Sequence, residues 1–330
     1  MRPFHYDRPA TATAAVSNFK PGAQYLAGGT TMVDLMKLDV MKPVRLVDIS
    51  GLEDGRYDFI NWSGNALRIG ALTPMATLAD DDEVLSRVPM LSDALWLAAS
   101  PQIRNMARIG GNVLQRTRCP YFRDTSYAQC NKREPGSGCA ALDGGVTRHH
   151  AVLGTSQKCI ATYPGDFAQA LIALDAVVEI LGADGPRSMR FADLHVLPDA
   201  RPDRETTLAP SDLIVAFSIE DADFPRSKYL KIRDRESYAY ALASTASALR
   251  MDGDAIADVR LGLGGVATTP WRAREAEAAL RGGPATEARF ARAADIAFAD
   301  ASTTEENAFK VELGKRTMVR SLLETARMEG

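Results

Sequence analysis

The chain has 330 residues, of which 46% are hydrophobic and 25% are charged, and its formal net charge at pH 7 is −3. At about 150 residues per domain, this length predicts two or three domains with a sizeable buried core. The composition excludes a collagen-like, coiled-coil or disordered protein, and the slightly acidic balance argues against a general nucleic-acid partner. No apolar run approaches the roughly 18 residues of a membrane span, and the first residues lack the apolar stretch of a signal peptide. From its own sequence we therefore expect a cytoplasmic chain without a membrane span.

Predicted strands and helices alternate along the first two thirds of the chain. Apolar spacing and turn residues predict strands at 24–26, 44–49, 67–71 and 214–219, helices at 32–38 and 82–99, and a helix followed by a strand within 170–181. Pro101 is expected to end the helix at 82–99. Residues 200–205 read as a polar loop, and a domain boundary is predicted near residue 222.

Helices dominate the predicted elements after this boundary. They comprise an Ala-rich helix at 238–250, a strand at 259–263, and helices at 273–281, 288–299 and 304–328. Thr303 and Glu306 form a capping-box pattern at the start of the last helix. We expect an α+β protein with one domain at 1–222 and a C-terminal α+β domain at 223–330.

All four cysteines of the chain lie in one stretch, residues 113–162, that has little periodicity. They are Cys119, Cys130, Cys139 and Cys159. A structureless loop of this length is unusual inside a compact domain, so we expect the thiols to order it. Residues 101–160 also contain nine Lys or Arg against three acids, a local positive excess that suits anionic cofactors.

Several kinds of site are compatible with four clustered cysteines. Disulfides are disfavoured in a reducing compartment, and zinc sites usually contain two cysteines two to four residues apart, which this chain lacks. An iron–sulfur cubane tolerates wide spacing because each iron needs one thiolate. Free cysteines packed as small hydrophobic residues are the remaining alternative. We interpret His149 and His150, between the last two cysteines, as an exposed pair rather than as ligands.

Two glycine pairs are candidates for phosphate binding. Gly28-Gly29-Thr30-Thr31 joins a predicted strand to a predicted helix, and Ile109-Gly110-Gly111-Asn112 repeats the combination of paired glycines and a small donor. Unpaired backbone N–H groups at a helix start bind anions, and glycine lets a ligand approach them. The alternative is an ordinary strand-to-helix turn. A third pattern, Gly262 to Ala267, is not a Rossmann fingerprint because Pro270 follows it.

Four segments in order resemble one family, the FAD-binding medium subunits of molybdenum hydroxylases, which include xanthine dehydrogenases and aldehyde oxidoreductases. They are L-A-G-G-T-T at 26–31, Q-I-R-N-M-A-R-I-G-G-N at 102–112, K-x-x-x-R at 231–235 and G-G-V-A-T-T-P at 264–270. The resemblance implies a two-subdomain α/β FAD-binding region of the vanillyl-alcohol-oxidase type, followed by an α+β domain.

The resemblance also implies which residues contact FAD. They are Leu26, Ala27, Gly28, Gly29, Thr30 and Thr31 in the first loop, Ile109, Gly110, Gly111 and Asn112 in the second, and Lys231 with Tyr240 or Tyr238 near the flavin ring. Tyr121 stands where most members have an Asp that holds the ribose or adenine, so Asp124 is the nearest candidate for that contact.

The insert R-T-R-C-P-Y-F-R-D at 116–124 resembles a narrower group, the FAD subunits of periplasmic aldehyde oxidoreductases, which carry an added 4Fe-4S cluster. By this resemblance the four cysteines are the cluster ligands. The chain is then an electron-transfer subunit that passes electrons from 2Fe-2S centres through FAD to an external acceptor. Its partners are a molybdenum-cofactor large subunit and a 2Fe-2S small subunit in a heterotrimer, and co-export with a signal-bearing partner can carry it to the periplasm.

Other functions compete with this reading. A 4-hydroxybenzoyl-CoA reductase-like or xanthine dehydrogenase-like β subunit would use the same FAD site with another partner. A stand-alone FAD oxidoreductase would turn over a substrate by itself, although the sequence offers no obvious acid/base or nucleophile set for this. A metal-binding module without enzymatic activity would contain no flavin.

Overall fold

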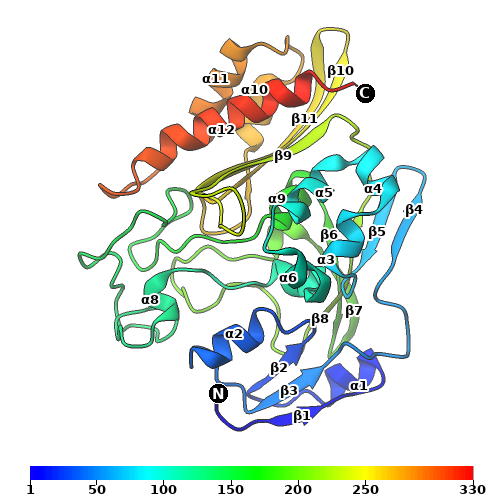
Figure 1. Cartoon of the computed structure of the whole chain (residues 1–330), viewed down its shortest axis with the longest axis vertical. Helices are drawn as coiled ribbons and strands as arrows, with labels where there is room; N and C mark the ends of the chain where they lie inside the picture. Colours follow the sequence, from blue (N-terminus) through cyan, green and yellow to red (C-terminus); the bar gives the residue numbers. More distant parts are fainter. Residues whose placement is uncertain (330) are drawn as a thin grey trace.

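Three β-sheets organise the computed structural model, which describes residues 1–329 (Figure 1). The first sheet is parallel, with the order β1-β3-β2, and consists of β1 (His5–Asp7), β2 (Ala23–Leu26) and β3 (Arg45–Asp48). Parallel neighbours need crossover connections, and the helices α1 (Ala12–Ser17) and α2 (Met32–Lys37) provide them.

The second sheet is antiparallel throughout. Its strands, in spatial order, are β4 (Ile60–Ser63), β5 (Ala66–Gly70), β8 (Leu213–Ile219), β6 (Val177–Gly182) and β7 (Gly185–Arg190). Short helices lie between β5 and β6 in the sequence: α3 (Met75–Ala79), α4 (Asp82–Arg87), α5 (Pro89–Trp96), α6 (Pro101–Met106), α7 (Ile109–Val113), α8 (Pro120–Arg123) and α9 (Phe167–Ala173). A 3-10 turn, η1 (Phe191–Asp193), follows β7.

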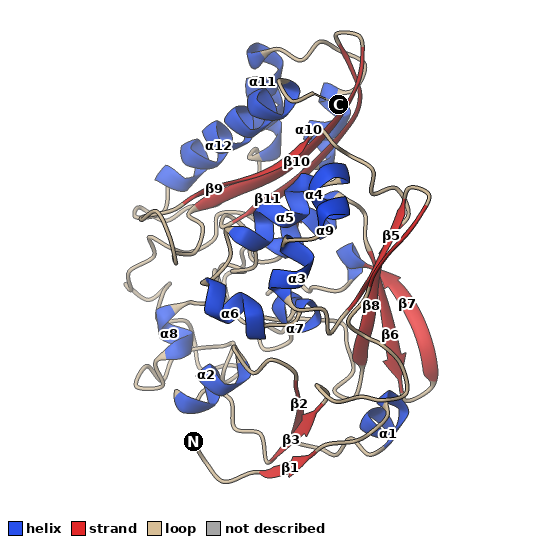
Figure 2. Ribbon diagram, turned by 45° about the vertical axis from the view of Figure 1, so that its right-hand side comes forward, coloured by secondary structure: helices blue, strands red, loops and turns tan. Residues whose placement is uncertain are grey.

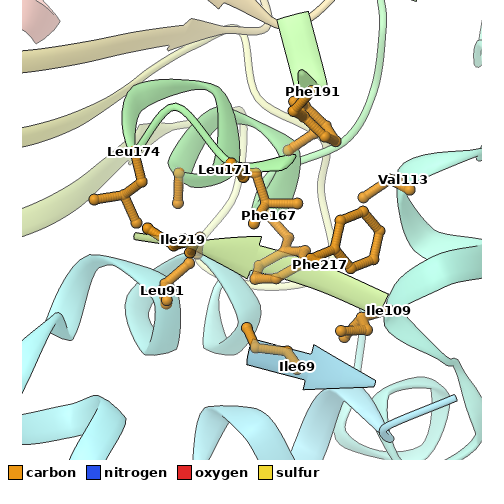
Figure 3. Packing of buried hydrophobic residues seen from close by; sticks show 14 of the residues in the cluster. Ile69, Leu91, Ile109, Val113, Phe167, Leu171, Leu174, Phe191, Phe217 and Ile219 are labelled. Atoms are coloured by element: carbon orange, nitrogen blue, oxygen red, sulfur yellow. The ribbon is translucent and has the colours of Figure 1, made fainter. Parts of the chain in front are cut away.

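The core beside this sheet fixes the position of α7. Phe167 of α9 and Phe217 of β8 face each other in it, and Ile109 and Val113 of α7 reach into the same cluster (Figure 3). All four side chains are fully buried. Ile109 and Val113 lie one helical turn apart, so their burial holds the backbone between them, including Gly111, in one orientation.

The third sheet belongs to the C-terminal part and has the order β12-β11-β10-β9 (Figure 2). Its strands are β9 (Ser227–Ile232), β10 (Ala243–Asp252), β11 (Ala255–Gly264) and β12 (Trp271–Arg272). The helices α10 (Arg274–Leu280), α11 (Glu287–Ala297) and α12 (Phe309–Ala326) follow, and α12 packs on β10 and β9. On residues 1–329, no helix combines the length and the apolar character needed to cross a membrane.

Most of the predicted elements are confirmed. The strands expected at 24–26, 44–49, 67–71, 214–219 and 259–263 correspond to β2, β3, β5, β8 and β11, and the helices expected at 32–38, 273–281 and 288–299 correspond to α2, α10 and α11. The helix and strand expected within 170–181 are α9 and β6. The α+β architecture is likewise confirmed.

The Ala-rich helix predicted at 238–250 is wrong, because this segment forms strand β10. Its residues from Ala243 to Leu249 are all buried, with Ala246 and Ala248 in the core shared with α5 and α9. Ser247 points to the other face, where its hydroxyl contacts those of Ser321 and Thr325 in α12. Small side chains let helices pack closely on both faces of the strand, and this tertiary packing overrides the helix propensity of alanine.

Two predicted helices, at 82–99 and 304–328, also differ from the structure in their boundaries. The single helix expected at 82–99 is interrupted at Val88, before Pro89, because proline lacks the N–H that a helix interior needs. Pro101 begins α6 instead of only ending the preceding helix. The last helix starts at Phe309 rather than at 304, and the Glu306 carboxylate accepts the backbone N–H of Thr147 instead of capping it.

The two-sided packing of β10 predicts that Ala246→Leu destabilises the protein, because the larger side chain must enter the space between the sheet and α5. We expect a loss of about 1–3 kcal/mol in the free energy of unfolding, measured by denaturant titration. The matched control is Ala257→Leu on the exposed side of β11, which should change stability little. Equal effects of the two substitutions would contradict this account.

Candidate cofactor site

A cavity of about 810 Å³ lies where three parts of the chain meet. The loop after β2, the first turn of α7 and the inner end of β9 all line it, represented by Gly28, Gly111 and Lys231. Cavities of about 300–1,000 Å³ are typical of sites for large organic ligands. The position of this cavity therefore makes it the candidate site for a cofactor.

The first loop presents unpaired backbone donors to the cavity. Within residues 1–329, the backbone N–H groups from Gly28 to Thr31 have no hydrogen-bond acceptor. A Cβ atom at Gly28 would lie 1.9 Å from the carbonyl oxygen of Met106, and Gly29 has a φ of +74°. Both positions therefore require glycine, the first for close approach and the second for its backbone conformation. Such a row of free N–H groups is suited to an anion.

The second loop offers fewer donors than the sequence predicted. The N–H of Gly110 donates to the carbonyl oxygen of Ala71 at 2.8 Å, and that of Asn112 donates to Arg108 at 2.8 Å. Of the three N–H groups from Gly110 to Asn112, only that of Gly111 has no acceptor within the described chain. The expectation that all three bind a diphosphate is therefore corrected to Gly111.

Gly111 faces open space, and the neighbouring Asn112 also lines the cavity. A Cβ atom built on Gly111 meets no protein atom within 4 Å, whereas one on Gly110 would lie 2.9 Å from the Cβ of Ala71. The side-chain oxygen of Asn112 is buried and has no hydrogen-bond partner in residues 1–329. Buried polar atoms are nearly always paired, so this oxygen indicates that a ligand donates to it.

Most, but not all, of the predicted contact residues line the cavity. Those that do are Ala27, Gly28, Gly29, Thr30, Thr31, Gly110, Gly111, Asn112, Lys231, Tyr238 and Tyr240. Leu26 and Ile109 lie behind the two loops, and Ile109 is part of the hydrophobic core.

Asp124 lies outside the cavity. Its side chain is exposed, and the carboxylate accepts the backbone N–H of Ser126 at 2.9 Å, which holds the pKa of Asp124 below its usual value. This hydrogen bond closes a local turn, so the structure corrects the expectation of a ribose contact at Asp124. Tyr121, at the position of the family's Asp, is buried beside the cysteines.

Lys231 is part of a buried network that sequence reasoning missed. Its ammonium group lies 2.8 Å from the carboxylate of Asp166 and 3.0 Å from the carbonyl oxygen of Leu97. The hydroxyl of Tyr229 donates to the same carboxylate at 2.6 Å, and burial with this neighbouring charge raises the pKa of Tyr229. Asp166 thus neutralises Lys231 at the cavity wall. The only signal for Asp166 is its place directly before the apolar run of α9.

Acids from distant segments neutralise much of the local positive excess. Asp34 of α2 pairs with both Arg118 and Arg123 at 2.8 Å, and Arg123 in particular lowers the pKa of Asp34. Glu205 pairs with Arg116 and Lys132; burial opposes ionisation of Glu205, yet these two cations keep its pKa below the usual value. Arg148 pairs with Asp234 in the same way, whereas the remaining cations of residues 101–160 have no ion-pair partner in residues 1–329: Arg104, Arg108, Arg133 and Lys158.

The structure gathers the four cysteines, all of them free thiols. Cys119 shares one apolar cluster with Cys130 and a second with Cys139. Burial raises the pKa of Cys119 to about 12, backbone N–H groups of the next turn oppose this, and the nearby Cys159 and Cys130 raise it further. In residues 1–329 no three His, Cys, Asp or Glu side chains are placed as the ligands of one metal ion, whereas a cubane takes each thiolate on a different iron.

Backbone N–H groups lie near two of the sulfur atoms. The N–H groups of Phe122 and Tyr121 lie close enough to the Cys119 sulfur to favour its thiolate, and that of Ala161 does the same for Cys159. Hydrogen bonds of this kind also surround the sulfur ligands of iron–sulfur clusters. The donor set therefore fits a bound cluster.

Arg133 contributes several hydrogen bonds that hold the cysteine insert together. Its guanidinium donates to four backbone carbonyl groups, those of Tyr121, Phe122, Asp124 and Tyr127. Charged donors make stronger hydrogen bonds than neutral ones, so this single side chain ties α8 to the following turn. The expectation that the thiols alone order residues 113–162 is corrected accordingly.

Asn131 holds the second half of the insert. Its side-chain oxygen accepts the N–H groups of Gly136 at 3.1 Å and Gly138 at 3.0 Å, and its amide donates to the carbonyl oxygen of Lys158 at 3.0 Å. These bonds close the turn between Cys130 and Cys139 and bring it next to Cys159.

The two histidines differ from the expected exposed pair. His149 is exposed, but His150 is only 2% exposed, and its Nε2 lies 3.3 Å from the sulfur of Cys119. Residue spacing carried no signal for this difference.

The comparisons with known proteins agree with this fold and site. Residues 2–219 match the family described as "FAD binding domain in molybdopterin dehydrogenase", and residues 228–325 match "CO dehydrogenase flavoprotein C-terminal domain". The chain therefore belongs to the FAD-binding medium subunits of the molybdenum hydroxylase family and is an oxidoreductase subunit. This confirms the family predicted from the sequence.

Three individual relatives show how similar the chain is to known proteins. The chain is 46% identical to the aldehyde oxidoreductase FAD-binding subunit PaoB of Escherichia coli K12, over 98% of both chains. It is 28% identical to the glyceraldehyde dehydrogenase medium chain of Sulfolobus acidocaldarius, over 76% of this chain and 71% of that one. The solved carbon monoxide dehydrogenase of Hydrogenophaga pseudoflava shares the fold, with a TM-score of 0.75, 24% identity and 98% coverage of both chains.

The open space at Gly111 provides a sharp test of the cavity. We predict that Gly111→Leu lowers FAD affinity at least tenfold, because its Cβ meets no protein atom within 4 Å and the rest of the side chain would take up space in the cavity. The flavin-free protein should unfold no more easily, since leucine favours a helix over glycine by about 0.5–1 kcal/mol. Flavin absorbance per chain and thermal unfolding measure the two effects.

The control for this substitution is Ala288→Leu, which adds the same side chain on the exposed face of α11. Gly29→Val is less informative, because a β-branched residue is strained at the φ of +74° found there. Full flavin occupancy in Gly111→Leu would exclude this cavity as the FAD site.

Proposed function

We propose that this chain is the electron-transfer subunit of a molybdenum-containing aldehyde oxidoreductase, and that it holds one FAD and one 4Fe-4S cluster. Electrons reach it from 2Fe-2S centres of another chain and leave through FAD to an external acceptor. We infer aldehydes as the substrate class of the complex from the relative of 46% identity, whose name states that class.

One observation carries the FAD site: unpaired N–H groups from two separate loops face one cavity of about 810 Å³. The first loop supplies those from Gly28 to Thr31, and the second supplies that of Gly111 with the unpartnered oxygen of Asn112. A dinucleotide carries a diphosphate between two larger groups, and donors on two sides suit that shape.

The cavity mouth sets access to the bound flavin. When bound, FAD takes up two electrons and can release them singly, and a 4Fe-4S cluster transfers one at a time. Tyr238 and Tyr240 line the cavity while staying 54% and 46% exposed, and the guanidinium of Arg118 lies 5.0 Å from the centre of the Tyr240 ring. Because both tyrosines line the cavity and also reach solvent, they are our candidates for the residues that would control how an acceptor reaches the bound flavin.

The cluster assignment is supported by the thiols and by what surrounds them. Cys119, Cys130, Cys139 and Cys159 would each hold one iron, and the backbone N–H groups near Cys119 and Cys159 would stabilise the bound thiolates. Arg133 and Asn131 keep the insert closed around this group.

The assembly we propose is a heterotrimer with a molybdenum-cofactor large subunit and a 2Fe-2S small subunit. We place the domain boundary near residue 222, between the ranges of the two matched families. The cytoplasm is the compartment expected from the chain itself, and co-export with a signal-bearing partner is the alternative.

The proposed roles of the subunits predict which reactions the purified chain can carry out alone. Loaded with flavin and iron and then reduced chemically, it should reduce acceptor dyes, and it should leave aldehydes unchanged until the molybdenum subunit is added. Dye reduction and aldehyde consumption are followed spectrophotometrically with and without the partners. The proposed role would be contradicted if the single chain, shown free of molybdenum, oxidised an aldehyde at an enzymatic rate.

The proposed cluster ligands lead to a second prediction, about the iron content and the proteolysis of two variants. Cys130→Ala, which removes one ligating atom, should lower the iron content below four per chain, while the hydrogen bonds of Arg133 keep the insert resistant to limited proteolysis. Arg133→Ala should instead open the insert to proteolysis with all four cysteines present. Four irons retained in Cys130→Ala would show that this cysteine is not a ligand.

A further inference from the structure

His150 is a buried residue that the proposed function has not yet used. Its Nε2 atom lies 3.3 Å from the sulfur of Cys119, and its ring stacks on that of Tyr121 with 6.1 Å between centroids and 25° between planes. The ammonium group of Lys310, from α12, donates to the backbone carbonyl of His150 at 2.9 Å. Contacts on the ring and on the backbone therefore hold the imidazole against the sulfur.

The surroundings of the second ring nitrogen of His150, Nδ1, indicate which of the two nitrogens carries the proton. Nδ1 of His150 is buried and has no hydrogen-bond partner in residues 1–329. A neutral imidazole carries one proton, and a buried N–H without an acceptor is costly. A proton on Nε2 avoids that cost, because Nε2 is the nitrogen that faces the sulfur.

Whether His150 or Cys119 donates this hydrogen bond depends on whether the Cys119 sulfur carries a proton. A free thiol can donate to Nε2, but a thiolate bound to iron has no proton to give. With Cys119 ligating a cluster, the hydrogen bond must therefore run from Nε2–H to the sulfur.

We propose that His150 donates this hydrogen bond to Cys119 and thereby raises the reduction potential of the cluster. The inference rests on the proposed 4Fe-4S site. Reduction adds one electron and increases the negative charge on the sulfur ligands, and a hydrogen-bond donor stabilises the more negative state. No proton needs to move in this step. His150 acts through Cys119 and is thus a positioning residue, not an iron ligand.

The test compares His150→Leu with His150→Gln in the iron-loaded chain. Leucine removes the donor, whereas the amide of glutamine can place an N–H near the position of Nε2. We expect the midpoint potential of His150→Leu to fall, so that at the wild-type midpoint the ratio of reduced to oxidised cluster drops about tenfold, which for one electron is about 59 mV. His150→Gln should recover most of this shift. An electron-paramagnetic-resonance redox titration measures it without turnover.

His149→Leu is the matched control, because His149 is the exposed neighbour and should leave the potential unchanged. Iron is counted in every variant, and His150→Phe replaces His150→Leu if the leucine protein loses its cluster. An unchanged potential in a four-iron variant without the donor would overturn the inference, and so would loss of iron from both His150→Phe and His150→Gln. Wild-type protein that binds no iron would instead contradict the proposed function itself.

Discussion

The cavity depends on the close approach of two backbone segments at Gly28. Any side chain there would collide with the carbonyl group of Met106, so the first sheet can meet α6 and α7 only through a glycine. On the other side, Ile109 and Val113 anchor α7 in the core and fix Gly111 across the cavity. Two loops that belong to separate layers thereby line one cavity, and FAD bound there as proposed would join the layers.

Backbone dipoles and side-chain cations both make the cavity favourable for an anion. Asp34 pairs with Arg118 and Arg123, and Asp166 pairs with Lys231, whereas Arg108 and Arg204 also line the cavity and have no ion-pair partner in residues 1–329. Oriented N–H groups contribute partial positive charges with no counter-charge of their own.

Local sequence patterns predicted those elements whose structure depends on neighbouring residues. They failed where contacts with distant segments determine the structure. The two glycine loops were recognisable because turn, strand and helix lie within a few residues of each other. Strand β10 was predicted as a helix, since nothing in its own composition shows that helices cover both of its faces. Asp166 and the burial of His150 were missed for the same reason, because their contacts join segments far apart in the chain.

The four carbonyl groups held by Arg133 have a consequence for the proposed 4Fe-4S site. A loop that folds only around its metal must pay the entropy of ordering whenever the metal binds, and it unfolds when the metal is lost. Here a guanidinium already supplies that order. For the proposed cluster this means that iron would bind to an insert that is already folded, and that a cluster lost to oxidation would be rebuilt without refolding of the subunit.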